Sequence, residues 1–177
     1  MKYQTCLSIS ETMVLIDEVK LLNLVYLGLG SNLGNKEEML QTAIEKINER
    51  IGVVVSQSAF YITPPWGFES ENDFLNAVVA CETKLSPQVV LKKTQQIERE
   101  CGRKRKSVDR HYEDRPLDID ILLYDDLVLK TDKLVIPHPL MHQRGFVLEP
   151  LNEIASGVVH PEMGKSIGEL FKELQAH

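Results

Sequence analysis

Apolar and polar side chains alternate most regularly over residues 115–124, where the sequence is Arg-Pro-Leu-Asp-Ile-Asp-Ile-Leu-Leu-Tyr. Successive side chains of a β-strand point to opposite faces of its sheet. The pattern therefore predicts a strand whose core face carries four aliphatic residues: Leu117, Ile119, Ile121 and Leu123. Asp118 and Asp120 share the opposite face, about 7 Å apart along the strand.

Two carboxylates on one strand face repel each other, and Mg²⁺, which prefers oxygen ligands, relieves that repulsion. Asp118 and Asp120 are therefore candidate metal ligands. A solvated strand face beside a turn is the alternative explanation, and it needs no metal. The basic segment that precedes the strand favours the metal site, because it places Arg115 three residues before Asp118.

Hydrophobic periodicity also predicts the other regular elements. Compact apolar runs with β-branched residues predict three strands, over residues 23–30, 52–62 and 73–85. Two short strands are predicted over residues 127–129 and 134–136. Apolar residues at helical spacing predict helices over residues 35–50, 86–101 and 166–175. Each helix starts at a residue suited to an N-cap: Asn35, Ser86 and Ser166.

Residues 28–35, Gly-Leu-Gly-Ser-Asn-Leu-Gly-Asn, join the first predicted strand to the first predicted helix. A glycine-rich turn between a strand and a helix is also found in phosphate-binding loops. This segment lacks the Gly-Lys-Ser/Thr ending of a P-loop, and its glycine spacing differs from the dinucleotide-binding fingerprint. We therefore favour a tight structural turn over a phosphate-binding loop.

Residues 63–68, Thr-Pro-Pro-Trp-Gly-Phe, follow the second predicted strand and contain the only tryptophan of the chain. Prolines donate no hydrogen bond to a strand ladder, so the segment is predicted to be a stiff loop. Its aromatic side chains suit stacking on a flat ring, although packing of the loop against the core is the alternative. Asn76 offers an amide that can read a heterocycle edge, or else cap the local backbone.

Residues 99–115 carry seven Lys or Arg residues against four Asp or Glu residues, although the whole chain has a net charge of −6. Cations beside metal-binding carboxylates fit a polyphosphate, because the metal takes some phosphate oxygens and arginines take others. A solvated loop and a nucleic-acid-binding arm are the alternatives. The acidic balance of the chain argues against bulk nucleic-acid binding, which needs a basic surface.

The length of 177 residues indicates one domain with a sizeable core. Three scattered cysteines without a Cys-x-x-Cys pair favour neither a disulfide framework nor a zinc site, and fit a reducing cytoplasm. The apolar runs near the start are too short for a membrane span. Residues 1–22 carry no recognisable chemistry, so we expect an N-terminal extension of unknown role before a domain over residues 23–177.

Several motifs in a fixed order resemble the 6-hydroxymethyl-7,8-dihydropterin pyrophosphokinase family of folate biosynthesis, over roughly residues 24–174. Each motif is weak alone, but their order is very specific. They lie at residues 30–34, 61–65, 74–77, 95–98, 102–105, 115–120, 137–139 and 144–146.

The resemblance implies an α+β fold, a ferredoxin-like sandwich in which an antiparallel sheet carries helices on its faces. It implies transfer of pyrophosphate from ATP to the hydroxymethyl group of 6-hydroxymethyl-7,8-dihydropterin, with release of AMP. The implied partners are these two substrates, with neither nucleic acid nor membrane, and the implied state is a monomer. Two Mg²⁺ ions are implied on Asp118 and Asp120.

The resemblance also assigns roles to further residues of this sequence. Three arginines of a mobile loop neutralise the triphosphate and are catalytic together with the two aspartates: Arg103, Arg105 and Arg115. Further ATP contacts are Gln95, Glu98, Lys133, His138 and Arg144. The implied pterin pocket consists of Thr63, Pro64, Trp66, Phe74, Asn76 and Phe146.

The sequence departs from the family pattern at two places. The basic loop of the family often carries a tryptophan that covers the substrates, whereas this loop offers His111 and Tyr112, and Pro139 stands where an aromatic residue is common. Two other functions remain as alternatives. A nucleic-acid-binding sandwich predicts aromatics in strand centres, and an inactive homologue predicts loss of Asp118, Asp120 or Arg115; the sequence matches neither prediction.

Overall fold

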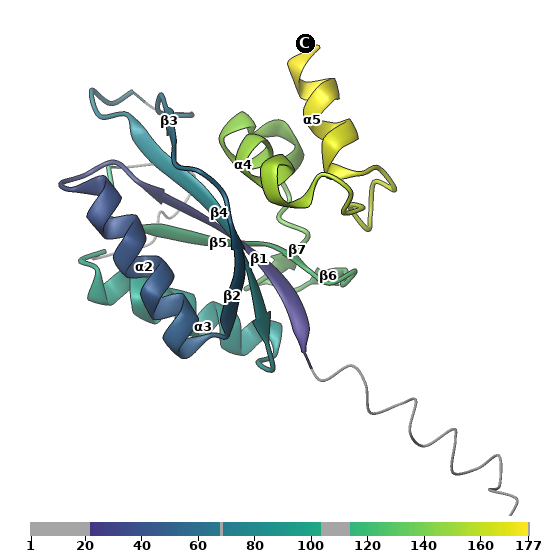
Figure 1. The fold of residues 1–177 in the computed structure, drawn as a ribbon, viewed down its shortest axis with the longest axis horizontal. Helices are drawn as coiled ribbons and strands as arrows, with labels where there is room; N and C mark the ends of the chain where they lie inside the picture. Colours follow the sequence, from purple (N-terminus) through teal and green to yellow (C-terminus); the bar gives the residue numbers. More distant parts are fainter. Residues whose placement is uncertain (1–21, 68, 104–113, 177) are drawn as a thin grey trace, which may run out of the picture.

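The computed structural model describes residues 22–67, 69–103 and 114–176. Its centre is an antiparallel sheet with the strand order β2-β4-β1-β5, in which β3 also pairs with β4 (Figure 1). The strands are β1 (Asn23–Ser31), β2 (Val53–Gln57), β3 (Tyr61–Thr63), β4 (Phe74–Thr83) and β5 (Asp118–Tyr124). Strands β2 and β3 follow one another along the same edge of β4.

Helices cover both faces of this sheet (Figure 1). One face is covered by α2 (Lys36–Arg50) and α3 (Pro87–Glu100), and the other by α4 (Gly145–Ala155) and α5 (Ile167–Gln175). Two short strands, β6 (Leu129–Lys130) and β7 (Val135–Ile136), pair with each other, and a 3-10 turn, η1 (Met141–Gln143), precedes α4. The expected α+β sandwich is confirmed. No helix in the described part of the chain is long and apolar enough to cross a membrane.

The central strand β1 separates two hydrophobic clusters by simple alternation. Val25, Leu27 and Leu29 pack into the cluster beneath α2 and α3, and each is at most 3% exposed. Tyr26 points to the other face and packs with α4 and α5. Because the strand alternates in this way, one sheet supplies two cores.

The three helices start at the predicted N-cap residues, but only Asn35 and Ser166 of these cap with their side chains, whereas Ser86 makes no side-chain capping hydrogen bond. Asn35 accepts a hydrogen bond from the backbone amide of Glu38, and Ser166 forms a complete capping box with Glu169. Pro87 occupies the first turn of α3.

The structure corrects the single strand predicted over residues 52–62, which is interrupted between β2 and β3. At the interruption, the Ser58 hydroxyl accepts the backbone N–H of Val78 at 3.0 Å. The next amide, that of Ala59, donates to the Glu153 carboxylate of α4 at 2.9 Å. A serine side chain and a helix carboxylate thus take over bonds that a continuous strand would make, and the chain divides into two strands.

The structure also corrects the face assigned to Leu123. Strand β5 pairs Ile121 with Leu27 but Leu123 with Tyr26, so Leu122 is an extra residue in the ladder. Such a bulge reverses the alternation of the strand. Leu123 consequently packs beneath α4 and α5, whereas Leu117, Ile119 and Ile121 pack beneath α2 and α3 as predicted.

Candidate active site

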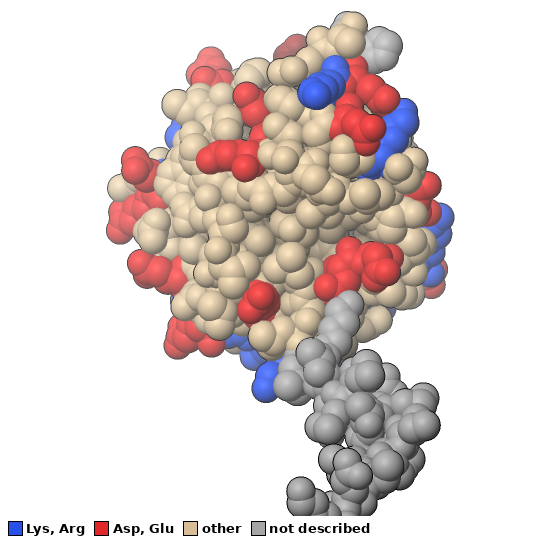
Figure 2. All heavy atoms as spheres, turned by 45° about the vertical axis from the view of Figure 1, so that its right-hand side comes forward, with Lys and Arg blue, Asp and Glu red and all other residues tan. Residues whose placement is uncertain are grey.

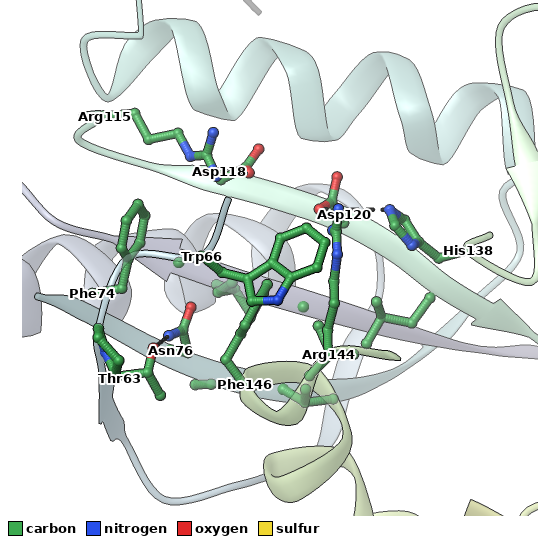
Figure 3. Close-up of a pocket in the computed structure, with 18 of the residues that line it drawn as sticks. Thr63, Trp66, Phe74, Asn76, Arg115, Asp118, Asp120, His138, Arg144 and Phe146 are labelled. Carbon is green, nitrogen blue, oxygen red and sulfur yellow. Dashed lines mark hydrogen bonds and ion pairs between the residues drawn. The ribbon is translucent and has the colours of Figure 1, made fainter. Parts of the chain in front are cut away.

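The candidate site is a cavity of about 230 Å³ whose floor is the α4-facing side of the sheet (Figure 3). Gly28 and Gly30 of β1 form the middle of this floor. Gly30 lies opposite Asn76 of β4 and Asp118 of β5 in the two ladders. Gly28 lies opposite Asp120 on β5. The glycines leave open space between an amide on one side and two carboxylates on the other.

This placement corrects the prediction that residues 28–35 form one turn, because β1 continues to Ser31. Among the glycines of residues 28–35, only Gly34, with a φ of 66°, takes the left-handed conformation that a turn glycine adopts. An ideal Cβ on Gly30 would lie 2.9 Å from Oδ1 of Asn76. Gly30 is therefore required for the close approach of the Asn76 side chain.

Aromatic and amide side chains form the β4 end of the cavity (Figure 3). Asn76 is 6% exposed and donates from Nδ2 to Oγ1 of Thr63 at 2.7 Å. The Trp66 and Phe146 rings have centroids 6.2 Å apart and an interplanar angle of 59°. Two aromatic faces beside a buried amide can hold a flat heterocycle by stacking and read its edge by hydrogen bonds.

Arginines and carboxylates form the β5 end. Oδ2 of Asp118 is 3.1 Å from Nη2 of Arg115, and its other oxygen pairs with Arg103. Nη1 of Arg103 also donates to Oε1 of the buried Glu98 at 2.7 Å. Burial opposes the charge of Arg103, but the carboxylates of Asp118 and Glu98 outweigh it and raise the Arg103 pKa. This end thus combines a fixed carboxylate with two permanent cations.

Asp120 lies one strand repeat further along, near His138, with 4.0 Å between Oδ2 and Nε2. Nδ1 of His138 accepts the backbone N–H of Leu140 at 3.3 Å, so a neutral ring carries its proton on Nε2. Burial lowers the pKa of His138 although the Asp120 charge opposes that shift, which favours the neutral ring. Arg144 closes this side with its guanidinium 4.8 Å from the Trp66 ring centroid.

The donor set fits a magnesium site that substrate completes. The structure places Asp118 and Asp120 on one face of β5, and no group of three or more His, Cys, Asp or Glu side chains suited to a metal occurs within the described residues. Mg²⁺ is commonly held by one or two carboxylates, with water and substrate phosphates as the other ligands. The two aspartates therefore match what a Mg²⁺-polyphosphate complex requires from a protein.

The sequence model of the 7,8-dihydro-6-hydroxymethylpterin-pyrophosphokinase (HPPK) family matches residues 26–156. The chain belongs to this family. It is 50% identical over 140 residues to the 2-amino-4-hydroxy-6-hydroxymethyldihydropteridine pyrophosphokinase of Porphyromonas gingivalis, covering 78% of this chain and 95% of that protein. It is 42% identical over 149 residues to the Aquifex aeolicus protein of the same name, covering 84% and 91%. The resemblance drawn from the motifs is thus confirmed, and the chain is a pyrophosphokinase.

A solved HPPK structure supports the fold assignment independently. A crystal structure of wild-type Plasmodium falciparum HPPK-DHPS with pteroate superposes with a TM-score of 0.72 at 16% identity. The match covers 86% of this chain, which spans 44% of that longer protein. At this identity the likeness bears on the fold alone, and it agrees with the ferredoxin-like sandwich.

Most of the site residues expected from the HPPK resemblance line this one cavity. They are Thr63, Pro64, Trp66, Phe74, Asn76, Arg103, Arg115, Asp118, Asp120, His138, Arg144 and Phe146. Gln95, Glu98 and Lys133 are not among its lining residues. Arg105 lies outside the described residues, as do His111 and Tyr112.

Glu98 has a position that its sequence context did not predict. It is 2% exposed, and its Oε1 accepts from the backbone N–H of Ile119 at 2.9 Å as well as from Arg103. Helix α3 therefore holds β5 and Arg103 together through one buried carboxylate. The family resemblance assigned both Gln95 and Glu98 to ATP contacts, but it did not indicate that Glu98 would be buried.

Sequence reasoning missed Asn32, which follows β1 and is 2% exposed. Its side chain accepts the backbone N–H of Arg115 at 2.7 Å and donates to Oδ1 of Asp114 at 2.7 Å. Its backbone N–H donates to the Arg115 carbonyl at 3.2 Å. Asn32 thus fixes the backbone of Arg115, a role that only the long-range packing of the chain makes visible.

Proposed function

We propose that this chain transfers the pyrophosphoryl group of ATP to the hydroxymethyl group of 6-hydroxymethyl-7,8-dihydropterin, giving the pterin diphosphate and AMP. One observation carries the proposal. A single cavity has an aromatic and amide end and a carboxylate and arginine end, and the floor between them consists of Gly28 and Gly30. A flat alcohol and a polyphosphate can therefore lie against each other without an intervening side chain.

The pterin is assigned to the β4 end. Asn76 reads the heterocycle edge, because its amide both donates and accepts hydrogen bonds. Phe146 and Trp66 stack on the ring, with Phe74, Thr63 and Pro64 around it. The 59° angle between Trp66 and Phe146 must close for the two rings to sandwich a ligand, so we expect the Trp66 ring to turn when the pterin binds.

The triphosphate is assigned to the β5 end. Asp118 and Asp120 would hold two Mg²⁺ ions, which supply charge neutralisation at the transferring phosphoryl groups and fix their orientation. Arg103 and Arg115 bind the remaining phosphate oxygens. We assign the same role to Arg105, outside the described residues.

Further nucleotide contacts are proposed at the rim of this end. His138 and Arg144 line the cavity beside Asp120 and are assigned to the nucleotide. Gln95 and Lys133 are also assigned to it, from the family pattern. We infer that Glu98 affects nucleotide binding indirectly, by holding Arg103 in place, since it accepts hydrogen bonds from Arg103 and from the backbone of β5.

The proposed reaction is an in-line displacement. The hydroxymethyl oxygen attacks the β-phosphorus of ATP, the bond between that phosphorus and the oxygen bridging to the α-phosphorus breaks, and AMP leaves with that oxygen. The hydroxyl proton passes to solvent. Phosphoryl transfer requires mainly positioning and charge stabilisation. Strand β5 would provide the positioning through its two aspartates, and Arg103 and Arg115 beside it would stabilise the charge.

A nucleic-acid-binding role has less support. Such a role requires a basic surface, whereas the floor of the cavity carries Asp118 and Asp120. On the face drawn in Figure 2, acidic side chains are spread among uncharged ones, and basic side chains lie beside acidic ones at the margins. We therefore propose small-molecule substrates as the partners of this chain.

The extent and setting of the catalytic unit are also proposals. We infer a catalytic domain over residues 23–177, since the sheet and both helical layers lie within this range, and we propose that it acts as a monomer. Residues 1–21 lie outside the described residues. A reducing cytoplasm is inferred from the scattered cysteines.

Product analysis tests the proposed function. The full chain is incubated with ATP, Mg²⁺ and the reduced pterin, and the nucleotides are separated by chromatography. The expected result is AMP, formed only when the pterin is present. ADP would indicate an ordinary kinase, and pterin-independent AMP would indicate hydrolysis; either result would overturn the proposal.

A further inference from the structure

Asp114, which directly precedes Arg115, joins three separate segments of the chain. Its Oδ1 accepts from the Ser70 hydroxyl at 2.6 Å and from Nδ2 of Asn32 at 2.7 Å. Its Oδ2 accepts from Nδ2 of Asn72 at 2.8 Å. The hydrogen bonds from Ser70, Asn72 and Asn32 lower the pKa of Asp114, so its carboxylate is ionised at neutral pH.

The donors to Asp114 belong to two segments, the loop between β3 and β4 and the residues directly after β1. Ser70 and Asn72 belong to the loop between β3 and β4, the same loop that carries Trp66 toward the proposed pterin end. Asn32 is buried and also fixes the Arg115 backbone. Two segments that serve different proposed substrates therefore meet at one carboxylate.

A second contact links the same two segments. The Arg115 guanidinium lies 5.4 Å from the centroid of the Phe74 ring, at the start of β4, and it pairs with Asp118 at 3.1 Å. A movement of the β3–β4 loop that shifts Ser70 and Asn72 must consequently pull on Asp114 and, through the backbone, on Arg115. Contacts of this kind transmit a binding event at one ligand to the position of a charge at the other.

We propose that Asp114 is a positioning residue that couples the binding of the pterin to the binding of the Mg²⁺-nucleotide. This inference rests on the proposed function. Asp114 is not among the residues that line the cavity; it acts through the β3–β4 loop on one side and Arg115 on the other. Because coupling between two sites is reciprocal, each substrate should tighten the binding of the other.

Titration calorimetry on the full chain measures this coupling. The dissociation constant of the pterin is determined with and without saturating Mg²⁺ and a non-hydrolysable ATP analogue, and the ratio of the two constants is the coupling factor. Asp114→Asn should lower this factor about fivefold, because it removes the negative charge and one of the two acceptor oxygens that Ser70, Asn32 and Asn72 share at this exposed site. Asp126→Asn, in the exposed turn after β5, is the matched control and should leave the factor unchanged.

A swap of donor and acceptor tests the specific pairing. In the double variant Asp114→Asn/Asn72→Asp, the amide and the carboxylate exchange places, and the coupling factor should return toward the wild-type value. If Asp114 had only a structural role, Asp114→Asn would lower the thermal stability and weaken pterin binding equally with and without the nucleotide analogue. The coupling factor would then stay unchanged. Ser70→Ala provides a second test, since it removes one donor and leaves Asp114 intact, and it should lower the factor severalfold.

The proposal is overturned if the coupling factor is one in the wild type, or if Asp114→Asn and Ser70→Ala leave it unchanged. It is also overturned if the double variant melts like the wild type but keeps the coupling factor of Asp114→Asn. Failure of the proposed function is read separately, from the products of the wild type: ADP, or AMP formed without the pterin, would show it whatever the coupling factor.

Discussion

The two faces of the central sheet are built from the same strands, and each packs against a hydrophobic cluster, but the α4-facing side also carries the cavity. Toward α2 and α3, β1 presents Leu27 and Leu29, which are at most 3% exposed. Toward α4, the same strand presents Gly28 and Gly30 in the floor of a cavity that also contains Asp118. Alternation lets one backbone ladder serve both purposes, because successive side chains point to opposite faces.

Different residues of the same strands stabilise the fold and line the cavity. Burial of a large aliphatic side chain stabilises a fold by about 1.5–3 kcal/mol, so the α2 and α3 face holds the strands in register. That rigid register keeps Asn76 and Asp118 on either side of Gly30. Substitutions of Leu27 or Leu29 should therefore reduce stability, and substitutions of the polar residues that line the cavity should reduce activity with little change in stability.

The largest effect is expected at Asp120. Asp120→Asn should lower kcat by about 10²–10³-fold, since one lost charge contact in the transition state is worth roughly 3–4 kcal/mol. The free energy of unfolding should change little or rise, because repulsion between the two carboxylates is relieved. AMP formation and urea denaturation measure the two quantities, with Asp126→Asn as the control. Near-normal turnover of Asp120→Asn would remove this residue from the proposed metal site.

The opposite outcome is expected at Leu27, directly beside the cavity floor but on the other face. Leu27→Ala should lower the free energy of unfolding by about 2–5 kcal/mol, the usual cost of a cavity in a packed core. Under conditions where the variant remains folded, its kcat should stay close to the wild-type value. Urea denaturation and steady-state kinetics test this, and a large loss of kcat in folded protein would show that the two faces are not independent.

A smaller and more selective effect is expected at Gly30. Gly30→Ala places a methyl group against Oδ1 of Asn76, displaces that amide from Thr63, and should weaken pterin binding about tenfold. Nucleotide binding should be retained. Gly157→Ala is the matched control, because a Cβ there meets nothing within 4 Å. Equal pterin affinity in Gly30→Ala and the wild type would argue against a role of Asn76 in reading the heterocycle.

The smallest effect is expected at Tyr61, where the cavity face of the sheet is tied to α4. The Tyr61 hydroxyl donates to Glu153 at 2.8 Å, and this hydrogen bond raises the pKa of Tyr61 to about 12. The unfolded chain ionises near pH 10. The contribution of this bond to stability is therefore complete below about pH 10 and is lost as the pH rises toward 12.

The Tyr61 bond is tested by comparing wild type and Tyr61→Phe in urea at several pH values. Tyr61→Phe should be less stable by about 0.5 kcal/mol at pH 8, as expected for an exposed hydrogen bond. This difference should shrink as the pH rises from about 10 toward 12, because the Tyr61 hydroxyl ionises in the unfolded chain before it does in the folded one. A difference that is constant across this range would mean that the hydrogen bond does not form in solution.

Local patterns were sufficient to predict much of the fold. Alternation around Asp118 and Asp120 placed them correctly on one face of a strand, and the capping residues Asn35 and Ser166 marked helix starts. These features depend on neighbours within a few residues. The break at Ser58 escaped prediction because its cause, a hydrogen bond to Val78, joins residues distant in the sequence.

Contacts between residues distant in the sequence also limited the prediction of the candidate site. The motifs indicated most residues that line the cavity, but the importance of Gly30 depends on its ladder partners Asn76 and Asp118, which no local pattern reveals. The contacts of Asp114 with Ser70 and Asn32 likewise bring together separate parts of the chain. Strand register and loop packing, rather than residue type, decide such roles.

The central claim is that both outer phosphates of ATP move as one unit onto the pterin in the glycine-floored cavity. A single-turnover reaction with ATP labelled in its γ-phosphate, Mg²⁺ and the reduced pterin tests this most directly. We predict that the label appears in the pterin diphosphate, together with an equal amount of unlabelled AMP. Label in inorganic phosphate or pyrophosphate, or in a pterin monophosphate formed with ADP, would contradict the account.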